Sequence, residues 1–425
     1  MRVKTRRNYG EPFFLAVTKR RLSPHSLLFL LFNLLYFLPL LGVLLFNYSE
    51  GGTITALALD PDTAGKVALI FSLGCCAFLC GSRLGSGISF FGISAVDKTA
   101  QTAGLRLLRL NWSFPVVCSV MVSALLISKL LLIRAGIYSD YAFDTASMTG
   151  GIWSFSMFCA ESVLFLSVAV LFSRVRRPVL WFLVLTLANG SNLLHGTRIF
   201  SMIAGVVFCF YLYVRRRFSW RIALAGAVGS LAVGYLVFLV RSNVLIDEQT
   251  FSLARIISPV MYEGVFSQIS LIQTVRDPHL WTPLGSPPDF LLDAFYFVMP
   301  RVLLPQKDTL LFLDKFTYLS PMGGFSGYAQ GLLYFGICFP LFYFVLGGLA
   351  AWLLRRAKDS SFWSVIYVYF ACDFLFRVMR DGYIIPVKML VNSLIILAFI
   401  ALCAPSTLGV APPERDLTAL SAPPD

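Results

Sequence analysis

The chain has 425 residues, of which 57% are hydrophobic and only 13% are charged, and its formal net charge is +13. A soluble globular protein is about half apolar and about a quarter charged, so this composition excludes an ordinary soluble domain. In a membrane protein a basic balance mostly reflects the loops that fix topology, so the charge does not predict nucleic-acid binding.

Hydrophobic runs of roughly 20 residues, the length that crosses a bilayer, recur along the chain and predict an all-α protein with about ten transmembrane helices. The first run follows a basic stretch, is long and lacks a small-residue cleavage site, which favours a retained helix over a signal peptide. The nine cysteines fall in hydrophobic segments, so neither disulfides nor a zinc site is predicted. The expected spans are residues 27–47, 65–82, 112–133, 152–172, 178–194, 199–214, 222–240, 328–352, 361–377 and 383–403.

Positive charge alternates between the connections that join these spans. Basic residues cluster in every second connection, whereas the loops at 48–64 and 134–151 are poor in basic residues and carry acidic ones. Because cytoplasmic loops are enriched in lysine and arginine, this pattern places both termini in the cytoplasm. The clusters assigned to the cytoplasm include Arg83, Lys98, Arg106, Arg109, Arg174, Arg176, Arg177, Arg215, Arg216, Arg217, Arg221, Arg355, Arg356 and Lys358.

One outer connection is far longer than the others. It contains amphipathic stretches around residues 251–275 and 289–304, separated by the turn-rich sequence PLGSPPDF. Such stretches can lie on the bilayer surface as a cap or lid, and an ordinary packed loop is the alternative. The predicted regions are residues 1–240 with seven spans, 241–327 as the large periplasmic loop, 328–403 with three spans, and 404–425 as a disordered cytoplasmic tail.

A polar sequence, NGSNLLHGTR at residues 189–198, separates the fifth and sixth spans. Both spans are short, so the turn should lie at or just below the outer surface, where non-helical backbone is tolerated only if it lines protein. Arg198 then begins a helix, and helix amino-termini and guanidinium groups both bind phosphate oxygens. We therefore predict a phosphate-binding role for Arg198, with His195 on the same rim. The alternative is an arginine that reaches lipid head groups and a histidine that is simply hydrogen-bonded.

Further arginines occur on the outer side, where topology does not require positive charge. Arg241 ends the seventh span, Arg377 and Arg380 end the ninth, and Arg255 lies in the large loop. An arginine at such a place commonly binds an anion. Asp381 could instead pair with Arg380, which would weaken the case for that arginine. We predict that a lipid-linked pyrophosphate is bound by Arg198, Arg241, Arg255, Arg377 and Arg380.

Glu263, in the sequence SPVMYEG, is the outer carboxylate best placed for catalysis. It follows Arg255 by eight residues on an amphipathic stretch, which puts the two roughly 80° apart around a helix. A carboxylate beside a bound pyrophosphate can accept the proton of an attacking sugar hydroxyl, so Glu263 and His195 are the predicted catalytic residues. A solvated surface glutamate is the alternative. The chain has no GxxxxGK[ST], GxGxxG or HExxH motif, and no nucleotide, cofactor or metal site is predicted.

These features resemble a known family, the repeat-unit polymerases of bacterial surface polysaccharides, or Wzy-type O-antigen polymerases. HGTRIFSMIAG is similar to the polar G-x-R opening of a helix in that family, and the single large outer loop lies in the second half of the chain. MGGFSGYAQGLLYFGICFPL, residues 322–341, is similar to the Gly-rich turn, carboxylate, aromatic and FG that follow the loop. Gln330 stands where the family has a glutamate, so an acidic role does not carry over there. The resemblance covers about residues 189–383.

The resemblance implies a GT-C-like fold and a glycosyltransferase without a cofactor. A growing glycan would move from undecaprenyl pyrophosphate to a new lipid-linked repeat unit, on the periplasmic face of the bacterial inner membrane. Implied partners are the undecaprenyl-pyrophosphate-linked oligosaccharide donor and acceptor, the lipid bilayer and a chain-length regulator. A pyrophosphate leaving group develops negative charge, and preorganised arginines stabilise such charge, so the predicted arginines agree with this reaction.

Three other functions remain open from the sequence. An O-antigen ligase, which transfers the finished glycan to lipid A-core, shares the arginines, the histidine and the large loop. A lipid-linked oligosaccharide flippase would place charges within its spans, and only Lys129, Glu161, Asp373 and Lys388 lie there. A membrane acyltransferase could use His195 as a base, but its donor usually arrives from the cytoplasm.

Overall fold

The described residues form α-helices with short 3-10 and π-helical turns, and no β-strand occurs within them. This computed structural model describes residues 23–46, 61–85, 113–135, 142–172, 177–195, 197, 199–215, 219, 221, 226, 229, 235, 253–281, 284–299, 303–319, 325–359 and 361–403. The predicted class, an all-α membrane protein with several spans, agrees with these helices.

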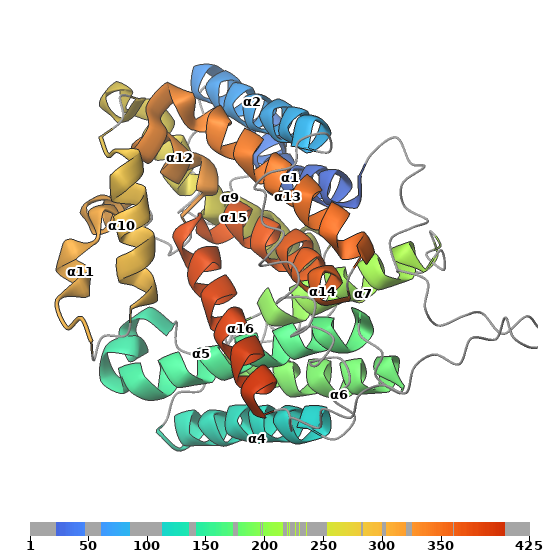
Figure 1. Cartoon of the computed structure of the whole chain (residues 1–425). Helices are drawn as coiled ribbons and strands as arrows, with labels where there is room; N and C mark the ends of the chain where they lie inside the picture. The colour runs from blue at the N-terminus through green and yellow to red at the C-terminus, as the bar shows by residue number, and fades with distance from the viewer. Residues whose placement is uncertain are drawn as a thin grey trace, which may run out of the picture.

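The helices fall into two groups along the chain. The first comprises α1 (Pro24–Phe46), α2 (Pro61–Gly85), α4 (Ser113–Arg134), α5 (Ala142–Phe172), α6 (Pro178–Gly190), the 3-10 turn η3 (Ser191–His195) and α7 (Ile199–Val214). The second comprises α9 (Leu253–Arg276), η4 (Pro278–Trp281), α10 (Pro287–Val298), α11 (Lys307–Leu310), η5 (Phe312–Leu319), α12 (Gly327–Phe335), η6 (Gly336–Cys338), α13 (Phe339–Asp359), α14 (Ser361–Tyr369), the π-helical turn η7 (Phe370–Phe374), α15 (Leu375–Asp381) and α16 (Ile384–Cys403). In Figure 1, α2 and α13 pack together on one side, α4, α5 and α6 on the other, and α9 and α15 lie between them.

Several helices have the length and composition of transmembrane spans. Within the described residues, five are long and apolar enough to cross a membrane: Pro61–Gly85, Pro115–Arg134, Gly151–Phe172, Gly327–Lys358 and Phe362–Asp381. Four shorter apolar helices are Pro24–Leu40, Pro178–Leu193, Ile199–Val214 and Ile384–Ile396. A helix therefore occupies each range expected from the sequence except 222–240, where only isolated positions are described. The total of ten spans stays a prediction.

The charge pattern predicts the side on which each loop lies, and cysteine labelling can test it. We expect Leu303→Cys, in the large loop, to react with an impermeant thiol reagent added to intact cells on the periplasmic side. Arg215→Cys, at the end of α7, should react only after the membrane is opened. Both side chains are exposed, so access depends on topology rather than on burial. Labelling of position 215 from outside, with position 303 protected, would invert the topology.

Apolar side chains line both the outside and the inside of the bundle, as expected where lipid replaces water. Leu187, Leu130 and Leu69 are 78%, 64% and 56% exposed on helices that match predicted spans. The interior is rich in aromatic rings, and Phe29 of α1 stacks on Phe78 of α2 with ring centroids 3.8 Å apart. These contacts fix α1 and α2 against each other in the core.

Glycines allow α2 and α13 to pack with their backbones in close contact. A Cβ atom on Gly81 of α2 would lie 1.9 Å from the carbonyl oxygen of Phe344, and one on Gly347 of α13 would lie 2.1 Å from that of Phe78. Small residues at membrane helix interfaces permit this kind of approach. The pair therefore depends on having no side chain at these positions.

We expect Gly81→Ala to destabilise the protein because the added methyl group must push α13 away from α2. A cost of about 1–3 kcal/mol is typical when a packed interface is overfilled. Gly65→Ala is the matched control in the same helix, since nothing lies within 4 Å of its Cβ position, and alanine favours helix over glycine. Thermal unfolding in detergent measures both variants. Equal melting temperatures for the two would contradict the close packing.

The helix α9 forms where the amphipathic stretch at 251–275 was predicted, but its carboxyl-terminal half does not lie on a surface. Gln268, Ser270 and Thr274 are fully buried, and Val265 and Ile272 are at most 2% exposed. In Figure 1, α9 lies in the middle of the bundle, behind α15. A surface position is therefore wrong for this half, because its polar side chains are enclosed by protein on almost all sides.

The second predicted stretch, at 289–304, overlaps α10, which fits an amphipathic helix better. Leu291 and Phe295 are 65% and 55% exposed, whereas Asp293 is buried. The carboxylate of Asp293 accepts hydrogen bonds from the backbone N–H groups of Phe312 and Leu313, at 2.7 and 3.1 Å, and from the Tyr334 hydroxyl. These bonds join α10 to η5 and to α12.

Candidate functional site

A cluster of ionisable side chains lies inside the bundle, around Arg377 of α15. The Arg377 guanidinium group donates hydrogen bonds to Asp373 Oδ1 and Glu161 Oε2, each at 2.7 Å. It also lies 4.0 Å from Asp381 Oδ2, and the Tyr369 hydroxyl donates to Glu161. The side chains of Arg377, Glu161 and Asp373 are at most 3% exposed. Buried charges are tolerated only when they are paired, so each member of this cluster depends on the others.

Four members of the cluster follow one another at intervals of four residues: Tyr369, Asp373, Arg377 and Asp381. That spacing places them along one side of the helix that runs through α14, η7 and α15. The π-helical turn η7 contains Asp373 and interrupts this helix at the cluster. Such turns occur frequently at functional sites. The four-residue repeat is a signal in the sequence from which one side of this cluster could have been predicted.

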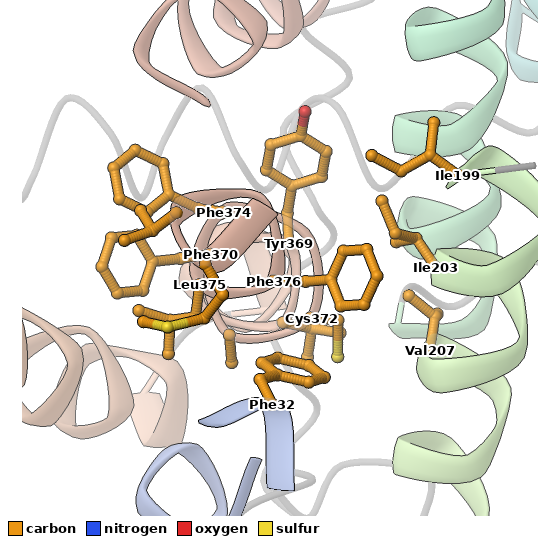
Figure 2. Close-up of a cluster of buried hydrophobic side chains, with 14 of the residues drawn as sticks. Phe32, Ile199, Ile203, Val207, Tyr369, Phe370, Cys372, Phe374, Leu375 and Phe376 are labelled. Carbon is orange, nitrogen blue, oxygen red and sulfur yellow. The ribbon is translucent and has the colours of Figure 1, made fainter. Parts of the chain in front are cut away.

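The first turn of α7 lies against this cluster. The ring of Phe200 is 5.4 Å from the guanidinium carbon of Arg377. Figure 2 shows Ile199, Ile203 and Val207, one stripe of α7, facing the helix that carries Cys372. The segment that directly follows Arg198 is therefore beside Arg377.

The cluster lies well inside the predicted membrane region. Glu161 is ten residues from Gly151, the first residue of the apolar part of α5, which corresponds to a depth of about 15 Å along the helix. Because α7 begins next to the cluster, the turn between α6 and α7 ends near this depth. Asn189 and Asn192 of the turn are fully buried, and Asn192 Nδ2 donates to the carbonyl oxygen of Asn189 at 2.9 Å. The polar turn therefore packs against protein, as expected, and its position below the outer surface stays a prediction.

Helices from the large loop and beyond it hold α15 in place. Gln268 Nε2 of α9 donates to the carbonyl oxygen of Met379 at 3.1 Å, and Gln268 Oε1 accepts from the Ser326 hydroxyl at 2.8 Å. The backbone N–H of Tyr383 donates to Gln330 Oε1 at 2.7 Å. The buried part of α9 is thus bonded directly to the helix that carries Arg377 and Arg380.

Gln330 therefore has a structural contact at the position where the resembling family has a glutamate. Its amide group packs against Gly382, which has a φ of 76°, and a Cβ atom there would lie 2.1 Å from Gln330 Nε2. Glycine at 382 is favoured both by its backbone conformation and by this close approach. The chain turns here from α15 into α16.

The structure describes only some of the other predicted site residues. The Arg380 side chain is 31% exposed, and its NH1 donates to Asp381 Oδ1 at 2.9 Å, the pairing considered from the sequence. Glu263 and Arg255 lie on α9 and His195 lies on η3, but their side chains are outside the described part of the structure. Two further predicted residues, Arg198 and Arg241, are themselves outside the described residues.

Comparison with known proteins does not assign the chain to a family. No family model matches the chain, and neither the search of curated proteins nor the search of solved structures gave a match. Among the residues that the structure describes, no group of three or more histidine, cysteine, aspartate or glutamate side chains is arranged to hold a metal ion.

Proposed function

We propose that the chain is a polymerase that joins undecaprenyl-pyrophosphate-linked oligosaccharide repeat units of a bacterial surface polysaccharide. In this proposal ten helices span the inner membrane in a GT-C-like arrangement, and glycosyl transfer takes place on the periplasmic face. A membrane protein of several apolar helices is consistent with lipid-linked substrates. The finer features of this fold belong to the proposal.

The observation that carries the proposal is the contact between Phe200 and Arg377. It puts the start of α7, which Arg198 precedes, beside Arg377, about one helical turn before the partly exposed Arg380. A pyrophosphate carries charge on several oxygens, and guanidinium groups from separate helices can bind it from more than one side. The approach of α7 to Arg377 supports the binding of such a ligand between these helices.

The proposed reaction exchanges one bond at the anomeric carbon for another. The acceptor hydroxyl oxygen attacks this carbon, the bond to the pyrophosphate oxygen breaks, and undecaprenyl pyrophosphate leaves with the electron pair. Arg198, Arg241 and Arg380 stabilise the charge that develops on it. Glu263 or His195 accepts the proton from the acceptor hydroxyl.

In the proposed reaction Arg377 has a positioning role, unlike the other arginines. Its Nε and NH2 already donate to carboxylates, so it can bind pyrophosphate directly only if a carboxylate partner is displaced. With its present partners it fixes the position of α15 relative to α5, and thereby of Arg380. Direct binding by Arg377 stays a prediction from the sequence.

A flippase for lipid-linked oligosaccharides is the second candidate, and the buried cluster favours it. Ionisable residues within membrane spans commonly mark transport pathways. Glu161, Asp373 and Arg377 come together inside the bundle, although the sequence shows few charges within spans. An O-antigen ligase shares the arginine pattern of a polymerase and differs from it in the acceptor.

Deletion of the gene in its native host separates these candidates. Loss of a polymerase leaves surface glycans that carry a single repeat unit. Loss of a ligase leaves polymerised glycan on its lipid carrier, and loss of a flippase leaves repeat units on the cytoplasmic side. We expect single-repeat glycans on gels of surface polysaccharide, and long chains of normal distribution would contradict the proposed polymerase.

We expect the purified protein to consume a lipid-linked donor without an added divalent cation. In the proposed reaction arginines stabilise the leaving pyrophosphate, which is the role of a metal ion in cation-dependent glycosyltransferases. The measurement is the rate of release of undecaprenyl pyrophosphate with and without a chelator, and the expected rates are equal. Loss of activity with chelator, restored by magnesium or manganese, would show that a metal ion stabilises the leaving group.

A further inference from the structure

Lys129 of α4 is a buried cation that the proposed active site does not use. Its side chain is 2% exposed, and its ammonium group forms no hydrogen bond within the described part of the chain. The ammonium nitrogen lies 5.5 Å from the ring centroid of Trp153 on α5. A cation–π contact recovers only a small part of the cost of removing an ammonium group from water. Among the residues that the structure describes, the ammonium group therefore has no anionic partner.

Other polar atoms without partners occur on the elements that pack against α4. The hydroxyl group of Ser156, one helical turn from Trp153, is fully buried and has no hydrogen-bond partner among the residues described. The 3-10 turn η3 and the helix α6 also contact α4. There Asn189 Nδ2 and Asn192 Oδ1 are buried, and they too lack partners within the described ranges. Lys129, Ser156 and the amide nitrogen of Asn189 are hydrogen-bond donors, and phosphate oxygens accept hydrogen bonds from such groups.

The site lies just beneath the lipid-facing surface of the bundle. In Figure 1, α4 lies at the edge of the bundle, with α5 and α6 beside it. Leu130 and Phe155, which flank the site on α4 and α5, are 64% and 51% exposed. Lys129 is five residues before Arg134, the last residue of α4, or about 7 Å along the helix. That depth is close to the interfacial layer in which lipid phosphates lie.

We propose that Lys129, with Ser156 and the asparagines of the α6–α7 turn, forms an anion site for the phosphate or pyrophosphate head group of a membrane lipid. Lys129 supplies the charge, and Ser156 and Asn189 supply further hydrogen bonds. The ligand enters between α4 and α5 with its hydrocarbon chain in the bilayer. The site lies across α5 from the cluster around Arg377.

The role of this site in the reaction rests on the proposed function. A polymerase that joins two lipid-linked repeat units must hold two lipid pyrophosphates at once. The arginines around α7 and α15 can hold one of them, and Lys129 is in a position to hold the other. Because the acceptor keeps its pyrophosphate throughout the reaction, a site away from the leaving group suits the acceptor.

Ligand binding to the purified protein tests the site without any need for catalysis. Wild-type protein and Lys129→Met in phosphatidylcholine nanodiscs would be titrated with farnesyl pyrophosphate, and the affinity taken from the thermal shift. We expect Lys129→Met to weaken the binding of one of the two farnesyl pyrophosphate molecules roughly 10- to 100-fold, as for the loss of one charge-assisted hydrogen bond. Without ligand this variant should melt no lower than the wild type, because it removes an uncompensated buried charge.

Two kinds of control are needed, one for the loss of any lysine and one for the parts of the ligand. Lys388→Met is the matched variant, since Lys388 also lies over an aromatic ring, that of Phe297 at 4.8 Å, and it should change the affinity by less than about threefold. Farnesol, which lacks phosphate, should not bind. Competition by inorganic pyrophosphate as strong as by farnesyl pyrophosphate would overturn the assignment to a lipid. Equal affinity in wild type and Lys129→Met would overturn the proposed site, and so would the absence of binding by the wild type. The proposed polymerase is tested independently, by the glycans of the deletion strain.

Discussion

Replacing Arg377 by alanine is expected to lower the free energy of unfolding by about 3–5 kcal/mol, the range measured when one partner of a buried ion pair is removed. The reason is that Glu161 and Asp373 would keep buried carboxylates without their cation. Membrane yield by fluorescence-detected chromatography and urea unfolding in detergent measure the loss. Arg380→Ala is the matched control on the same helix, and with its partly exposed side chain it should cost less than about 1 kcal/mol.

A combined variant shows whether charge imbalance causes this loss. Arg377→Met together with Glu161→Gln and Asp373→Asn replaces the two hydrogen-bonded ion pairs of the cluster by neutral side chains of similar volume. Such replacements of buried ion pairs are often neutral or stabilising. We expect the triple variant to recover most of the stability lost in Arg377→Ala. If Arg377→Ala is as stable as Arg380→Ala, the buried ion pairs do not support the fold as described.

Replacing Arg198 or Arg241 by alanine is expected to reduce the rate of polymerisation by about 10²–10³, as when one donor to a developing oxyanion is removed. Both arginines are predicted to contact the leaving pyrophosphate. Lysine should restore activity only in part, because it cannot form two parallel hydrogen bonds to phosphate. The distribution of glycan chain length in a complemented deletion strain measures the effect.

Membrane levels must stay normal for that loss to be attributed to catalysis. Arg83→Ala provides the comparison, since Arg83 lies in the last turn of α2, on the side predicted to be cytoplasmic. It should leave chain length unchanged. A normal chain-length distribution in both Arg198→Ala and Arg241→Ala would remove these arginines from the proposed reaction.

The positions of most helices could be predicted from the sequence, because runs of apolar residues determine them directly. The predicted spans at 112–133 and 152–172 correspond closely to α4 and to the apolar part of α5. The pairing of Arg380 with Asp381 was also foreseen, since neighbours in sequence need no knowledge of the fold. Such local features can be predicted from the sequence without knowledge of the tertiary structure.

Contacts between distant segments could not be predicted in the same way. Glu161 and Arg377 lie 216 positions apart in sequence, and no pattern in either segment indicates the other. The amphipathic pattern of α9 suggested a surface helix, but Gln268 is hydrogen-bonded to Ser326 and to the backbone of Met379. Buried polar groups depend on such partners, which a single sequence does not reveal.

The most direct test of the proposed polymerase is a reaction with purified protein in liposomes, supplied only with undecaprenyl-pyrophosphate-linked repeat units. The predicted result is a ladder of lipid-linked oligomers on a gel, with one undecaprenyl pyrophosphate released for each new glycosidic bond. Arg198→Ala should slow the appearance of this ladder. Repeat units that remain single while they cross the bilayer would contradict the polymerase and establish a transporter instead.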